Sequence, residues 1–170
     1  MLSKCQSPPS FGFTDALTAG DGAEDGELSL VAGLLGNDLS LAALTTAENR
    51  DGARCQATVQ FSASKLSFSV HKLFQACKKS GLKAGSFTGS SQLASCFDVL
   101  ATDASGKLAR ARDKTSSKMA KTCASVDVSQ TLPGSCSTSP DGTAAADCAV
   151  EVTLCETCLE LNVIDGMAYD

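Results

Sequence analysis

Residues 55–79 read CQATVQFSASKLSFSVHKLFQACKK, and this stretch decides the fold class that the sequence predicts. Its apolar residues recur three, four and seven positions apart, which places them on one face of a helix: Cys55, Val59, Leu66, Val70, Leu73, Phe74 and Cys77. A separate basic stripe has a spacing of seven and consists of Lys65, Lys72 and Lys79. The stretch therefore predicts a long amphipathic helix with a cysteine near each end.

A second helical region is expected from Ser91 to Cys123, after a turn rich in Gly, Ser and Thr. Its first apolar face consists of Leu93, Cys96, Phe97 and Leu100. The pattern continues after a break at Ser105-Gly106, and basic residues then share one face of the helix: Lys107, Arg110, Lys114, Lys118 and Lys121. No aromatic residue is interleaved with this stripe in the sequence, which argues against nucleic acid as a partner.

Two antiparallel helices joined by a turn predict two disulfides. Cys77 and Cys96 then lie together at the turn, and Cys55 and Cys123 lie together at the opposite end of the hairpin. We therefore expect the bridges Cys77–Cys96 and Cys55–Cys123, each of which closes a loop and adds ~2–4 kcal/mol of stability.

The last part of the chain predicts a loop followed by a third helix. The loop from Ser125 to Thr143 contains Cys136, and the helix from about Ala144 to Leu161 carries Cys148, Cys155 and Cys158 on one face. We expect Cys136 to bond one of these three cysteines, while the other two either bond each other or reach elsewhere. The spacing does not choose between these pairings.

Nine cysteines in 170 residues indicate a disulfide framework in an oxidising, extracellular compartment. Zinc is disfavoured because Cys155 and Cys158 form the only C-x-x-C pair and His71 is the only histidine. Acidic neighbours of that pair raise a thiol pKa rather than lower it, so redox chemistry is disfavoured too. Because the number of cysteines is odd, Cys5 is left without a partner. It either forms an intermolecular bond, remains a free thiol or reaches back into the folded domain.

Residues 1–53 differ from the rest and are expected to form an amino-terminal arm. Leu28 to Leu35 and Leu39 to Thr46 alternate apolar and other residues around Gly36-Asn37-Asp38, which predicts a β-hairpin; Asp38 could equally cap a short helix. The residues expected to pack on another copy or on the chain's own domain are Phe11, Phe13, Leu28, Leu30, Leu34, Leu39 and Leu41. Such strands are unstable alone and pair readily with another chain.

Charge is divided into three blocks along the chain. Residues 1–54 carry three basic and eight acidic side chains, residues 55–124 carry eleven basic and three acidic ones, and residues 125–170 carry eight acidic and no basic ones. A basic block between two acidic blocks indicates electrostatic complementarity within the chain or between copies.

From Arg54 onward the chain resembles a cysteine-rich helical domain of uncharacterised secreted bacterial proteins. The resemblance covers residues 54–170. It depends on Lys121-Thr122-Cys123, on Pro133-Gly134-Ser135-Cys136, and on Cys155-Glu156-Thr157-Cys158 followed by Asp165-Gly166. It implies secretion and disulfides, and it supplies no catalytic residues.

The sequence thus predicts a mainly α, disulfide-stapled helical hairpin with a third helix and a small amino-terminal β arm. The expected function is that of a secreted, non-enzymatic structural protein, a subunit of a filament, sheath or surface layer that assembles through its arm with copies of itself. The alternative is a secreted helical module that binds a partner protein or a small apolar ligand between its helices. No metal, cofactor, nucleic acid or membrane span is expected, because no motif for one is present.

Overall fold

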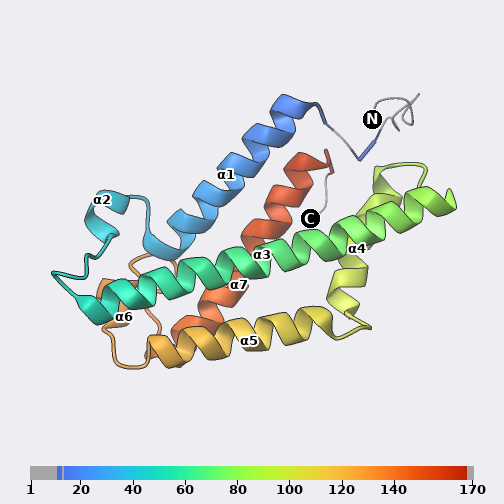
Figure 1. The fold of residues 1–170 in the computed structure, drawn as a ribbon. Helices are drawn as coiled ribbons and strands as arrows, with labels where there is room; N and C mark the ends of the chain where they lie inside the picture. Colours follow the sequence, from blue (N-terminus) through green and yellow to red (C-terminus); the bar gives the residue numbers. More distant parts are fainter. Residues whose placement is uncertain (1–10, 13, 168–170) are drawn as a thin grey trace.

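The predicted first helix is the longest element of the computed structural model, which describes residues 11, 12 and 14–167. Within these residues the chain is mainly α-helical and contains no strand (Figure 1). The helices are α1 (Ala16–Leu35), α2 (Leu39–Ala42), α3 (Arg50–Ala84), α4 (Ser90–Thr102), α5 (Lys107–Thr122), α6 (Val128–Thr131) and α7 (Gly142–Ile164).

Helix α3 is capped at both ends. The Asn49 side chain accepts a hydrogen bond from the backbone N–H of Gly52 at 2.8 Å. Gly85 ends the helix in the left-handed region, with φ of 69°, and its N–H bonds back to the last turn. A helix of 35 residues is about 52 Å long at 1.5 Å per residue.

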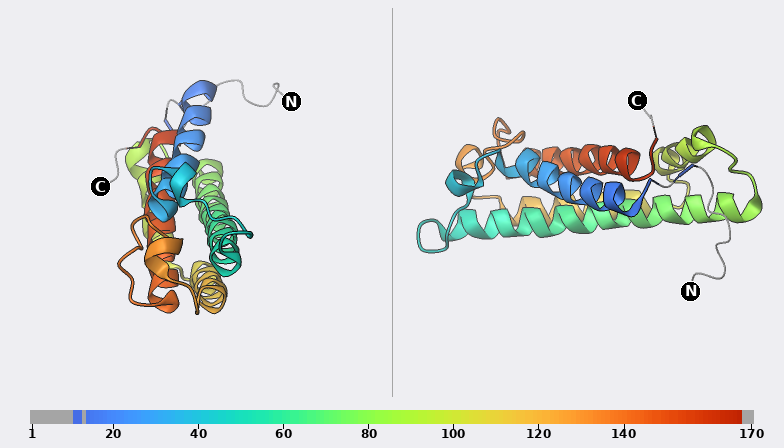
Figure 2. Two further views of the ribbon diagram at one scale, coloured as in Figure 1. Left: turned by 90° about the vertical axis from the view of Figure 1, so that its left-hand side faces the viewer. Right: turned by 90° about the horizontal axis from the view of Figure 1, so that it is seen from above.

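The second predicted helical region consists of two helices, α4 and α5. The break between them is close to the predicted break at Ser105-Gly106. Asp103 and Gly106 both adopt left-handed backbone conformations, and the chain turns between α4 and α5 at these residues. Helix α4 packs on α3, and α5 then runs back along α3 in the opposite direction (Figures 1 and 2). The predicted helical hairpin is therefore present, with α4 forming its corner.

Helix α7 lies between the hairpin and α1. It packs on α3 and α5 with one side and on α1 with another. Its start is fixed by Asp141, whose carboxylate accepts hydrogen bonds of 2.9 Å from the N–H groups of Thr143 and Ala144. Two clusters of buried side chains fill the interior, one around Val59, Met119 and Leu132, and the other around Leu66, Phe74 and Phe97.

The predicted β-hairpin is wrong. Leu28 to Leu35 lies within α1, and the segment that begins at Leu39 forms the short helix α2, which Asp38 caps. The leucines alternate as in a strand, but Leu30 and Leu34 are also four residues apart, which is the spacing of side chains on one face of a helix. Both are buried against the rest of the domain. Phe13 lies outside the described residues.

Residues 20–26 read GDGAEDG, a composition typical of a turn, yet they lie within α1, where glycines face α7. A β-carbon on Gly22 would lie 2.8 Å from Val163 Cγ1, and one on Gly26 would lie 2.6 Å from Glu160 Cγ. One on Gly33 would lie 3.0 Å from Val152 Cγ1. The three glycines share one face of α1, so they let this helix approach α7 closely. Their function here is close packing rather than a change of chain direction.

Candidate functional site

The cysteines form three disulfides among the described residues. Cys55 bonds Cys123 and Cys77 bonds Cys96, which are the two pairs that the helical hairpin predicts. Cys136 in the loop bonds Cys148 at the start of α7, which answers the pairing that the sequence left open. Each bridge joins segments from different parts of the chain, so together they fix both ends of the hairpin and the loop before α7. Cys5 lies outside the described residues.

Cys155 and Cys158 are free thiols, which corrects their assignment to the disulfide framework. Both lie on α7, three residues apart, with Cys155 exposed and Cys158 partly buried. Burial raises the pKa of the Cys158 thiol above its ordinary value, and the neighbouring Cys155 adds to the increase. A raised pKa means less thiolate at neutral pH, which is the opposite of an activated nucleophile.

We therefore expect Cys158 to be alkylated slowly in the native protein. Its reaction with iodoacetamide at pH 7 should be slower than that of a cysteine in a short peptide, because less of the thiol is ionised and access is restricted. The rate should keep rising at pH values where the peptide's rate has levelled off. Mass spectrometry of timed samples measures both rates. If Cys158 reacted faster than the peptide at pH 7, the thiol would be activated and a redox or nucleophilic role would gain support.

His71 lies at the boundary between α3 and α7. Its Nε2 atom is 3.0 Å from Glu160 Oε2, and both side chains are mostly buried. The pair lies where Gly26 of α1 contacts Glu160, so three helices meet there. Among the described residues, no group of three or more His, Cys, Asp and Glu side chains is arranged to hold a metal ion.

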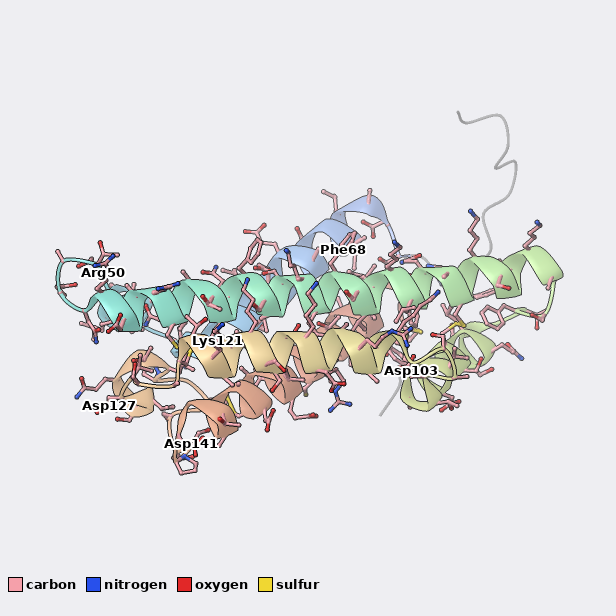
Figure 3. The ribbon with its side chains drawn as sticks, turned by 60° about the horizontal axis from the view of Figure 1, so that its bottom comes forward. Arg50, Phe68, Asp103, Lys121, Asp127 and Asp141 are labelled. Carbon is pink, nitrogen blue, oxygen red and sulfur yellow. A yellow bond between two sulfur atoms is a disulfide. The ribbon has the colours of Figure 1, made fainter. Side chains whose placement is uncertain are left out.

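An exposed stripe on α3 alternates aromatic and basic residues. Phe61 and Phe68 are 54% and 70% exposed, and Lys65 and Lys72 are exposed beside them. Spacings of four, three and four place the four side chains on one face of the helix. Figure 3 shows this side of the molecule, with Phe68 near the middle of α3 and Lys121 at the end of α5. We call Phe61, Lys65, Phe68 and Lys72 the α3 stripe.

The α3 stripe continues onto α5 through a cation–π cluster. The Lys65 ammonium lies 4.2 Å from the centre of the Phe61 ring, and the ammonium of Lys118 from α5 lies 4.9 Å from it. In the sequence, no aromatic residue lies within the basic stripe of α5, because Phe61 is far from it along the chain. The fold brings the ring and both bases together.

An exposed stripe on α1 has the opposite charge. Leu17 and Leu28 are 78% and 56% exposed, and Asp21 and Glu24 are exposed between them. Their spacings are again four, three and four, so these four side chains share one face. Helix α1 contains no basic residue. We call Leu17, Asp21, Glu24 and Leu28 the α1 stripe. Within the described residues, none of the four charges in the two stripes takes part in an ion pair.

The described residues that were expected to form an assembly arm fall into two groups, one buried or partly buried and the other exposed. Leu30 and Leu34 are buried in the chain's own core, and Phe11 is partly buried. Leu28, Leu39 and Leu41 are exposed. The arm is also tied to its own domain, because the Thr14 hydroxyl donates a hydrogen bond of 3.0 Å to the carbonyl of Ile164. The described part of the arm therefore packs on its own domain and presents a helix face rather than a strand edge.

A half-open pocket of about 470 Å³ lies where α3, α4, α5 and α7 meet. Its walls are mainly apolar and include Val70, Leu100, Leu108 and Leu154. Arg112 and Cys158 also line it. The volume falls within the range of small-molecule sites in proteins. The sequence pattern gave no signal for this pocket, because its lining residues come from four separate helices.

We find no family model, curated protein or solved structure that matches this chain. Over the described residues, the chain is a helical protein whose helices and loop are linked by three disulfides. These bonds are consistent with an oxidising compartment. Among the described residues, no helix is both long enough and apolar enough to span a membrane.

Proposed function

We propose that this chain is a non-enzymatic structural protein of an extracellular compartment, and that its copies associate head to tail. The contact joins the α1 stripe of one copy to the α3 stripe of the next. The disulfides support the extracellular location. Assembly still uses the amino-terminal arm, as the sequence suggested, but through a helix face.

The observation that carries the proposal is the match between the two stripes. Each presents two large apolar and two charged side chains over 12 residues, from Leu17 to Leu28 and from Phe61 to Lys72. At 1.5 Å per residue, each stripe extends over about 16 Å of helix. The two charged residues of the α1 stripe are both negative, and the two of the α3 stripe are both positive. The two faces are therefore similar in length and opposite in charge.

The apolar side chains supply most of the expected affinity, and the charges supply the choice of partner. Fully burying one Leu or Phe side chain is worth roughly 1.5–3 kcal/mol. An exposed ion pair contributes only about 0–1 kcal/mol. Charge complementarity instead favours the α1–α3 contact over contacts between like stripes, where repulsion costs several kcal/mol.

Such a contact is heterologous, because each copy uses a different surface on each side. A heterologous contact produces a closed ring when the rotation between copies closes, and an open filament when it does not. Either outcome leaves every internal copy with both stripes covered. A subunit of an extracellular filament or layer is the function that this arrangement supports best.

The test is the oligomeric state in sedimentation velocity experiments at low and high salt. We expect the protein to form assemblies at 20 mM NaCl and to associate more weakly at 1 M NaCl, because salt screens the charges. The variant Lys65→Glu/Lys72→Glu should associate about a hundredfold more weakly, because it places like charges opposite each other.

The matched control reverses two exposed lysines outside the stripe. Lys107→Glu/Lys121→Glu has the same net charge as the stripe variant but changes only α5. It should assemble like the unmodified protein. A chain that stays monomeric at high concentration and low salt would overturn the proposal, and so would equal losses in the two variants.

A further inference from the structure

The pocket between the helices has an apolar interior with few polar groups. Leu100 and Phe97 come from α4, Leu108 from α5, Leu154 from α7 and Val70 from α3. All of these except Leu154 are buried residues of the second core cluster, and Leu154 packs against that cluster. The pocket therefore extends from the core to the surface. A long apolar molecule that enters it replaces water on side chains that already pack on one another.

One cationic group among the lining residues is available to a ligand. Arg112 donates a hydrogen bond to Glu151 of α7; the Arg112 side chain is partly exposed and that of Glu151 is largely exposed, so this ion pair contributes little stability. Asp103, the acidic residue in the lining, is already engaged, because its carboxylate accepts a hydrogen bond of 2.8 Å from the Ala109 N–H. The guanidinium of Arg112 can therefore exchange Glu151 for a ligand carboxylate at little cost.

We infer that this pocket binds an elongated apolar molecule that ends in a carboxylate, with the chain inside the pocket and the carboxylate on Arg112. A pocket of about 470 Å³ with an apolar interior and one cationic side chain fits this class of ligand. The inference is independent of the proposed self-association, because none of the lining residues belongs to either stripe.

Dodecanoate is the probe, and isothermal titration calorimetry with the full chain is the measurement. We expect dodecanoate to bind more tightly than dodecanol, which has the same chain and no charge. Arg112→Gln should weaken dodecanoate binding about tenfold and leave dodecanol binding unchanged. Glu151→Gln should strengthen dodecanoate binding, because it frees the guanidinium. Ala109→Trp, at an exposed position in the lining, should block both ligands without disturbing the core.

The two free thiols provide a second readout. Cys158 lines the pocket and Cys155, three residues before it, does not. Saturating dodecanoate should slow alkylation of Cys158 several-fold and leave the rate at Cys155 unchanged. The inference is overturned if neither ligand binds, if Arg112→Gln affects both ligands equally, or if dodecanoate protects both thiols or neither. Failure of self-association would leave all of these results unchanged.

Discussion

Replacing Cys55 and Cys123 together by alanine should lower the free energy of unfolding by about 4 kcal/mol. Their disulfide closes a loop with a sequence separation of 68 residues, and it joins the start of α3 to the end of α5. Without it, the unfolded chain gains the entropy of that long loop. Both side chains are also fully buried, so the smaller alanines leave unfilled space in the first core cluster.

The matched comparison is Cys136→Ala/Cys148→Ala. That bridge closes a sequence separation of only 12 residues, so its loss should cost about 3 kcal/mol by the same loop-entropy argument. Urea denaturation followed by circular dichroism measures both variants. A larger loss of stability in the Cys136/Cys148 variant than in the Cys55/Cys123 variant would contradict the loop-entropy argument.

Phe74→Ala should have a comparably large effect, about 3–5 kcal/mol of lost stability. The Phe74 ring is fully buried, and its centre lies 5.1 Å from that of Phe97, so it joins α3 to α4 in the second core cluster. Truncation removes this contact and leaves a cavity at the corner of the hairpin. Thermal or urea unfolding of the variant measures the cost.

Phe68→Ala is the control for this prediction, on the same helix and with the same chemical change. Phe68 is 70% exposed, so its truncation should change stability by less than about 0.5 kcal/mol. The same variant should weaken self-association, because Phe68 belongs to the α3 stripe. Equal destabilisation by the two substitutions would contradict the assignment of Phe74 to the core.

The helical hairpin could be predicted because its signals are local. Apolar residues recur at helical spacing from Cys55 to Cys77, and the turn follows directly. The cysteines at the helix ends then left one simple geometry for two disulfides. The break between α4 and α5 could be predicted as well, since Gly106 adopts a conformation that other residues disfavour.

The amino-terminal region could not be predicted because its glycines act through a distant helix. Gly22 and Gly26 resemble turn residues until α7 is placed against them. The state of Cys155 and Cys158 could not be predicted either, because their spacing fits both a bond between them and two free thiols. The α3 stripe was read as basic alone, because the exposure of Phe61 and Phe68 depends on which side of α3 the rest of the fold covers.

The central claim is that the α1 stripe of one copy contacts the α3 stripe of another, and mixing two charge-reversed variants tests it most directly. Lys65→Glu/Lys72→Glu has two acidic stripes, and Asp21→Lys/Glu24→Lys has two basic stripes. We expect each to stay monomeric alone in sedimentation velocity experiments at 20 mM NaCl, and their equimolar mixture to assemble, because every contact in the mixture then joins opposite charges. Assembly of either variant alone to the extent of the unmodified protein, or a mixture that remains monomeric, would contradict the claim.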